Sequence, residues 1–313
     1  MREIGGYIEL QGLKSKEYHK NALALNLARN CVIYLIKAKK IKKLYVPYYM
    51  CSSLDNAKNY CEVVYYKINE SFLPIYDGEM KDNEYIYIVN YFGQIGNDKI
   101  KSLKNKYKNV IIDNVQAFFQ KPVKGIDTIY SCRKFFGVPD GAYLYTDSRI
   151  TEDLDIDYSI NRFKHLLGRA ENNAQTHFND YKNNEKELDN QPLLVMSKLT
   201  HIILGAMQYQ KIKKIRTENY KYLRKQLEQF NGIKTKSIVG AYSYPFYTEN
   251  AEEIRKKLIN KKIYVPTLWP NVLEIEKEDD ISYKFARNIL PIPLDQRYNK
   301  GDMDYICQII KKG

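Results

Sequence analysis

A lysine in the middle of the chain stands where it could act as a nucleophile. Lys134 follows a β-rich run and precedes a Pro-Asp-Gly turn at 139–141, after which another β-rich run begins. A lysine amine beside a sheet can form a Schiff base with an aldehyde cofactor. Its neighbours are Arg133, Phe135 and Phe136, and such an apolar, cationic neighbourhood is expected to lower its pKa, as nucleophilic use requires. The alternative is an ordinary lysine in a surface loop.

An acid and an amide occur at the end of a second apolar run. In the segment IIDNVQAFF, Asp113 closes the run and Gln116 follows three residues later. Ligands of open α/β sheets bind at the carboxyl ends of the strands, so an acid at this point is well placed to meet a ligand. The plainer interpretation is that Asp113 caps the turn or helix that follows it.

Two further segments could contact a bound molecule. Arg29 and Asn30 lie at the start of an expected helix, where free backbone N–H groups and the helix dipole suit a phosphate. In VPYYMCSS, Tyr48 or Tyr49 follows an expected strand and could stack on a planar ring. A core position is an equally good interpretation of either tyrosine, because the chain contains 29 tyrosines.

The elements that would position these residues alternate between helix and strand. An apolar face at helical spacing predicts a helix over 21–40, and further helices are expected over 51–59 and 97–107. Runs rich in β-branched and aromatic residues predict strands at 42–49, 61–68, 84–92, 109–115, 127–132 and 142–147. This alternation indicates an α/β architecture with a mostly parallel central sheet and helices on both of its faces.

The pattern changes after residue 150. The polar segment 151–190 is expected to form helices and loops at the edge of the sheet domain, and a long helical pattern spans 193–230. Short elements follow: a strand at 241–248, a helix at 251–262, a strand at 263–269 and a helix at 302–312. We therefore expect a large α/β domain at 1–192, and a long helix with a small C-terminal α+β domain at 193–313.

Composition narrows the classes of function. The net charge is +13, but the lysines are spread along the chain and no nucleic-acid-binding module is recognisable, so a lysine-rich background explains the charge best and attraction of an anionic substrate comes second. The five cysteines form no Cys-x-x-Cys pair and the four histidines are scattered, which argues against a disulfide framework or a metal site. No apolar run suits a membrane span and the first ten residues lack a signal-peptide core, so a cytoplasmic location is expected.

Several short segments, taken in order, resemble one family of enzymes. After the helix at 28–38 come VPYYMCSSL, VNYFGQ, IIDNVQAFF, SCRK, MSKL and LPIPLDQRY. Each segment is weak alone, but the ordered set runs through nearly the whole chain. By this set the chain resembles the DegT/DnrJ/EryC1/StrS family of pyridoxal-phosphate enzymes, whose best-known members aminate keto-sugars linked to nucleotides. The resemblance implies fold type I of the pyridoxal-phosphate-dependent transferases and pyridoxal 5'-phosphate as the cofactor.

The resemblance implies roles for the residues of the lysine–acid pair and its neighbour. Lys134 matches the lysine that forms the Schiff base. Asp113 matches the acid that pairs with the pyridine nitrogen and keeps it protonated, so that the ring can accept electrons. Gln116 matches the position that contacts the ring hydroxyl.

The remaining matches concern the phosphate and the ring face. Ser131 matches a serine that helps to hold the phosphate, and Arg29 and Asn30 match helix-start positions whose backbone binds it. Tyr49 lies in the segment that supplies the ring-stacking aromatic, and a shift of two residues would place Cys51 there instead. The asparagine that the family carries before MSKL, which reaches the neighbouring subunit's phosphate, is replaced here by the segment QPLLV.

The function implied by the resemblance is transfer of an amino group from an amino acid such as glutamate to a keto-sugar, in the synthesis of surface polysaccharide or a related product. The active site of this fold type usually lies at a dimer interface, so a homodimer is expected, and no nucleic-acid or membrane partner. Two alternatives stay open: a pyridoxal-phosphate lyase, dehydratase or decarboxylase, and a non-catalytic relative that binds a ligand or partner. Sugar-dehydrating members usually replace the lysine, which this chain keeps.

Overall fold

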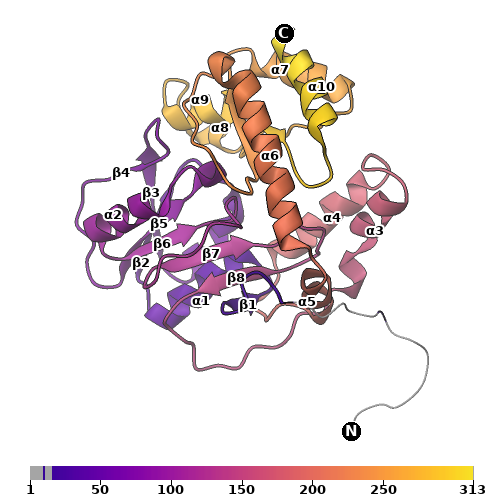
Figure 1. The fold of residues 1–313 in the computed structure, drawn as a ribbon. Helices are drawn as coiled ribbons and strands as arrows, with labels where there is room; N and C mark the ends of the chain where they lie inside the picture. Colours follow the sequence, from indigo (N-terminus) through magenta and orange to yellow (C-terminus); the bar gives the residue numbers. More distant parts are fainter. Residues whose placement is uncertain (1–9, 11–15, 313) are drawn as a thin grey trace.

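An eight-stranded sheet forms the centre of the larger part of the molecule (Figure 1). The computed structural model describes residues 10 and 16–312. Across the sheet, the strands are β1 (Leu23–Leu25), β8 (Ala142–Tyr145), β7 (Asp127–Ser131), β6 (Val110–Asp113), β5 (Glu84–Val89), β2 (Lys43–Pro47), β3 (Glu62–Ile68) and β4 (Pro74–Ile75). Strands β7, β6, β5, β2 and β3 run parallel to one another. At one edge, β8 is antiparallel to β7 and β1 is antiparallel to β8, and at the other edge β4 is antiparallel to β3. The expected mostly parallel sheet is confirmed.

Helices cover both faces of the sheet. Side chains of neighbouring residues in a strand point to opposite faces. Ile129 of β7 packs in one core cluster with Val32 of helix α1, whereas the next residue, Tyr130, packs in another with Leu204 of α5. The helices of this part are α1 (Ala28–Lys39), η1 (Ser52–Asn59), η2 (Tyr91–Gly93), α2 (Asn97–Tyr107), η3 (Ile160–Arg162), α3 (Lys164–Glu171), α4 (Phe178–Asp189) and α5 (Lys198–Gly205).

A smaller unit with its own core follows, drawn in orange and yellow in Figure 1. Its antiparallel strands β9 and β10 pair along their length. The elements are α6 (Tyr209–Leu227), η4 (Glu228–Phe230), β9 (Ser243–Tyr247), α7 (Ala251–Asn260), α8 (Val272–Ile275), α9 (Ile281–Asn288), β10 (Ile289–Pro293) and α10 (Lys300–Lys311). Helix α6 joins the two parts, because Tyr209 packs with the sheet's cluster and Leu223 with the small unit's core. The domain boundary at 192/193 stays a prediction.

Three elements differ from the sequence-based expectations. The helix expected over 21–40 begins only at Ala28, because the preceding residues pair with β8 as strand β1. The helical pattern over 193–230 is divided between α5 and α6. The strand expected at 263–269 is absent from the described chain. Pro266 lacks an N–H donor and Trp269 has a positive φ of 58°, both unfavourable to a strand.

No helix in the part of the chain that the structure describes is both long enough and apolar enough to cross a bilayer.

Candidate active site

The loop between β7 and β8 presents Lys134. The loop folds back at once, because the backbone N–H groups of Phe135 and Phe136 both donate to the carbonyl of Cys132, at 3.0 and 2.9 Å. Both phenylalanine side chains are buried in the aromatic cluster against the sheet. Lys134 itself is exposed. The turn thus anchors its backbone through two buried neighbours, while the lysine side chain keeps part of its surface exposed.

The surroundings of Lys134 raise its pKa, which corrects the expectation of a lowered one. The first cause is the negative charge that Tyr242 can carry, and Cys51 and Tyr181 act in the same direction. Burial and the charge of Arg133 oppose them. Arg133 forms an ion pair with Glu185 of α4, so part of the cationic neighbourhood expected from the sequence is neutralised. Lys134 is therefore protonated at neutral pH in the free protein.

Asp113 is the last residue of β6 and is buried. The Tyr87 hydroxyl donates to its Oδ2 at 2.6 Å, and the Val115 N–H donates to its Oδ1 at 2.8 Å. Burial raises the pKa of Asp113 to about 6, against the opposing effects of these two hydrogen bonds and of the Lys134 charge. Lys134 and Asp113 therefore lie within each other's electrostatic reach. Asp113 in turn raises the pKa of Cys31 in α1, in addition to the larger effect of burial.

Gln116 and Ser131 lie at the same edge of the sheet as Asp113. Strands β6 and β7 are parallel neighbours, so Asp113 and Ser131, which end them, share the carboxyl edge. The Gln116 side-chain oxygen accepts a hydrogen bond of 2.8 Å from the Phe92 N–H. Its amide nitrogen donates to no other group among the described residues. Gln116 therefore keeps both of its amide N–H donors free near the strand ends.

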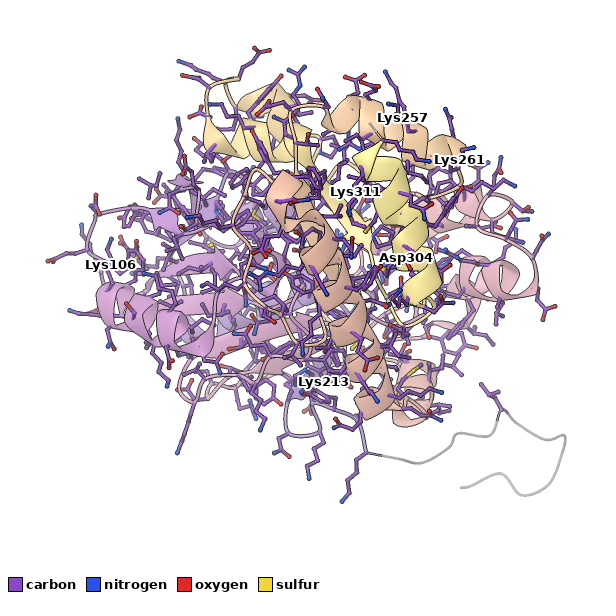
Figure 2. The ribbon with its side chains drawn as sticks, turned by 45° about the horizontal axis from the view of Figure 1, so that its top comes forward. Lys106, Lys213, Lys257, Lys261, Asp304 and Lys311 are labelled. Carbon is purple, nitrogen blue, oxygen red and sulfur yellow. The ribbon has the colours of Figure 1, made fainter. Side chains whose placement is uncertain are left out.

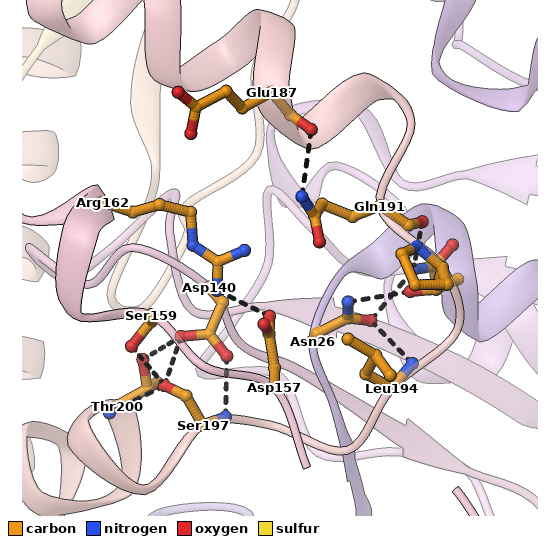
Figure 3. Close-up of polar contacts among 12 residues, drawn as sticks. Asn26, Asp140, Asp157, Ser159, Arg162, Glu187, Gln191, Leu194, Ser197 and Thr200 are labelled. Carbon is orange, nitrogen blue, oxygen red and sulfur yellow. Dashed lines mark hydrogen bonds and ion pairs between the residues drawn. The ribbon is translucent and has the colours of Figure 1, made fainter. Parts of the chain in front are cut away.

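The start of α1 offers backbone rather than side-chain groups. The N–H groups of Ala28 and Arg29 have no acceptor among the described residues. The Arg29 guanidinium forms an ion pair of 2.7 Å with Asp189, and the Asn30 amide donates to the Pro192 carbonyl at 2.7 Å. The backbone there is thus open to an anion, whereas both side chains bind the segment around 190. Figure 3 shows the hydrogen bonds that hold this segment.

Tyr49 has no free ring face, which corrects its expected role in stacking. It is fully buried, with its ring 4.6 Å from that of Trp269 and 5.8 Å from that of Phe285. Its hydroxyl has no hydrogen-bond partner in the described part of the protein. Cys51, two residues further on, is exposed and acts on the pKa of Lys134. The position that faces the site after β2 is therefore a cysteine.

Three tyrosines of the site had no local signal in the sequence. Tyr87 comes from β5 and reaches Asp113 because the two strands are parallel neighbours, with Val89 beside Asp113. Tyr181 comes from α4 and Tyr242 from the segment before β9. The register of the sheet brings Tyr87 to the acid, whereas the packing of α4 and of the small unit brings Tyr181 and Tyr242 to the lysine.

No metal cluster defines this site in the described part of the chain. Among the residues that the structure describes, no three His, Cys, Asp or Glu side chains gather as metal ligands. A surface hollow of about 600 Å³ at the start of α6 is lined by Lys16, Lys20 and Lys211 among others, and none of the expected site residues is part of it. The site rests instead on a lysine and an acid at neighbouring strand ends.

Comparisons with known proteins identify the fold. No family model matches the chain, and the search of curated proteins found no match. Among solved structures, a DegT DnrJ EryC1 StrS aminotransferase from Brucella abortus has 12% sequence identity and a TM-score of 0.63, over 93% of this chain and 85% of its own. A sugar aminotransferase from Micromonospora echinospora has 11% identity and a TM-score of 0.64, over 94% and 88%.

A third similar structure is that of a dehydratase rather than an aminotransferase. It is the Escherichia coli GDP-4-keto-6-deoxy-D-mannose-3-dehydratase with bound hydrated PLP, at 15% identity and a TM-score of 0.61, over 92% of this chain and 87% of its own. The chain therefore has the fold of pyridoxal-phosphate-dependent transferases, as expected. At these identities the likeness shows the fold alone.

Proposed function

We propose that the protein is a pyridoxal-phosphate-dependent aminotransferase that acts on a keto-sugar. The observation that carries this proposal is the placement of Lys134 and Asp113. Asp113 ends β6, Lys134 lies in the loop that follows the parallel neighbour β7, and the charge of Lys134 lowers the pKa of Asp113. A lysine for covalent attachment and an acid for a ring nitrogen are the two groups that this cofactor requires from a protein.

The other groups of the site fit the cofactor in part. Gln116 has a free amide donor for the ring oxygen, and Ser131 with the N–H groups at the start of α1 supplies donors for a phosphate. No aromatic ring faces the site at the position after β2, where Cys51 stands. The donor set thus fits the polar groups of the cofactor, and one ring face lacks the expected aromatic partner.

In this proposal, each residue of the site has a separate role in the reaction. When bound, the cofactor supplies the electron sink. Lys134 holds it, and its freed amine moves the proton at the α-carbon as general base and acid. Asp113 is mostly ionised at neutral pH, since its pKa is about 6, and a ring cation beside it would favour the ionised form further. Tyr87 and Val115 fix its two oxygens by hydrogen bonds.

The structural neighbours support the choice of substrates in this proposal. Two of them are described as a sugar aminotransferase or a putative one, which supports transfer from an amino acid such as glutamate to a keto-sugar, with a nucleotide-linked sugar as the leading candidate. In balanced form, glutamate and the keto-sugar give 2-oxoglutarate and the amino-sugar. We place the enzyme in the cytoplasm, as a homodimer, in the synthesis of surface polysaccharide or a related product.

The second candidate is a dehydratase or lyase that uses the same cofactor. The E. coli dehydratase among the similar structures favours it, whereas the retained Lys134 favours amino transfer. Purified protein loaded with pyridoxal phosphate and mixed with glutamate tests the choice. Amino transfer predicts one equivalent of 2-oxoglutarate per site before any keto-sugar is added. Formation of the cofactor complex without 2-oxoglutarate would support the second candidate instead.

A further inference from the structure

Arg216 of α6 is a buried cation without a carboxylate partner. Its exposed fraction is 2%, and no ion pair joins it to an acid among the described residues. Burial lowers its pKa to about 10, so it remains charged at neutral pH. A buried guanidinium is costly unless each of its donors is satisfied. The acceptors of its hydrogen bonds therefore indicate the structural role of Arg216.

The guanidinium donates to both parts of the molecule. On the small-unit side, Nη1 donates to the carbonyls of Ala241 and Tyr242, at 3.0 and 3.4 Å, and Nε donates to the Gln296 side-chain oxygen at 2.7 Å. On the sheet side, Nη2 donates to the carbonyl of Phe135 at 3.3 Å. The planar fork of arginine can serve several carbonyls in one arrangement, which an ammonium group cannot.

The contact at Phe135 is made three times over. The Gln296 amide nitrogen donates to the same Phe135 carbonyl at 2.8 Å. The Arg216 guanidinium also lies over the Phe135 ring, with its central carbon 4.6 Å from the ring centre. Phe135 directly follows Lys134. The backbone of the lysine turn is thus held from the small unit by two side chains that also hold each other.

Tyr242 is held by the same arginine. Its carbonyl accepts from Arg216, and its ring centre lies 5.9 Å from that of Phe135. Tyr242 comes from the small unit and Lys134 from the sheet edge, so no strand pairing fixes their separation. Arg216 is the described side chain that hydrogen-bonds both the residue after the lysine and Tyr242.

We propose that Arg216, together with Gln296, is a positioning residue that fixes the Lys134 turn against the small unit and so sets the place of the lysine amine beside Tyr242. The assignment of Lys134 to the chemistry rests on the function proposed above, whereas the hold on the turn does not. The hydrogen bonds of Arg216 join it neither to Asp113 nor to another residue that is expected to bind the cofactor. It therefore acts through the backbone of Phe135.

Hydrogen–deuterium exchange of the protein without cofactor tests the hold directly. Arg216→Lys keeps the charge but loses the fork, so exchange in peptides covering 132–138 should rise at least about tenfold. Peptides from β6 and α10 should stay unchanged. The same replacement at Arg224, which pairs with Glu228 one turn further along α6, is the matched control and should leave 132–138 unchanged. Equal exchange at 132–138 in Arg216→Lys and wild type would overturn the proposal, as would a uniform rise throughout the chain.

A second variant covers the case in which Arg216→Lys does not fold. Gln296→Leu removes the other donor to Phe135 and also the acceptor of Arg216 Nε, while the Arg216 side chain is retained, so the same local rise is expected; an unchanged exchange rate would overturn the proposal. With pyridoxal phosphate added, either variant should also shift the pH at which the Schiff-base absorbance titrates. If no absorbance band forms in any variant or in wild type, the proposed function fails, and the exchange result still decides whether Arg216 holds the turn.

Discussion

At the scale of single residues, the site combines an exposed lysine and a buried acid with opposite needs. Lys134 must lose a proton to attack an aldehyde, although its neighbours raise its pKa. Asp113 must keep a negative charge in a place where burial raises its pKa. Without a bound partner, Lys134 is therefore less reactive as a nucleophile, and the buried charge of Asp113 lowers the stability of the folded protein. A cofactor with an aldehyde and a ring cation would relieve both.

The raised pKa of Asp113 predicts how stability depends on pH. The pKa is about 6 in the folded protein and 3.8 in the unfolded reference, so the folded state binds the proton more tightly. Its contribution is fully present below pH 3.8 and is lost as the pH rises through 6, by about 3 kcal/mol. In denaturant titrations of the protein without cofactor, Asp113→Asn should remove this part of the decline between pH 4 and 6. An identical decline in the variant would contradict the assignment.

At the scale of elements, local sequence patterns predicted most strands of the sheet, but they did not predict contacts between residues far apart in the chain. The runs that end at Asp113 and Ser131 were visible in the sequence, and parallel pairing of neighbouring strands then places both at one edge. The burial of Tyr49 depends on Trp269 and Phe285, more than 200 residues away, so no local pattern could show it. Tyr242 likewise reaches the site only because α6 docks the small unit on the lysine turn.

The end of the lysine loop is tied to helix α5 by a buried carboxylate. Asp140 accepts hydrogen bonds from the Ser197 N–H at 2.8 Å, from the Ser197 hydroxyl at 2.7 Å and from the Thr200 hydroxyl (Figure 3). Asp140→Ala should therefore lower the free energy of unfolding by about 2 kcal/mol or more, because buried donors lose their acceptor. Chemical denaturation measures the change. The control Asp98→Ala removes an exposed ion pair with Lys101 and should cost less than about 0.5 kcal/mol; equal effects of the two changes would refute the role of Asp140.

At the scale of the whole molecule, charge and apolar surface are distributed differently. Lysines project from opposite ends, including Lys106 on α2, Lys213 on α6 and Lys257 on α7 (Figure 2), which agrees with a dispersed background charge rather than one binding face. Six of the fifteen large apolar side chains that are exposed among the described residues lie in one stretch of sequence around α3 and α4: Ile156, Tyr158, Ile160, Leu167, Phe178 and Tyr181. Helix α3 buries none of its residues in the single chain. Tyr181 also acts on Lys134, so this surface adjoins the site.

This apolar surface predicts the interface of the proposed homodimer. Sedimentation should give a mass twice the 36.9 kDa of one chain. The double change Tyr158→Asp and Leu167→Asp should shift the protein to monomers at micromolar concentration, because the introduced charges would be buried unpaired in the interface. Tyr60→Asp, at an exposed tyrosine outside this stretch, should leave the mass unchanged. A wild-type monomer, or a double variant that stays dimeric, would place the interface elsewhere or remove it.

The attachment of the cofactor to Lys134 tests the account most directly. Purified protein mixed with pyridoxal phosphate should develop the visible absorbance band of a protein-bound Schiff base, and borohydride reduction followed by peptide mass analysis should find the label on Lys134. Lys134→Ala should lose both the band and the label, while Lys124→Ala, a change on the preceding loop, should keep them. A band of wild-type intensity in Lys134→Ala, or no band in the wild-type protein, would contradict the central claim.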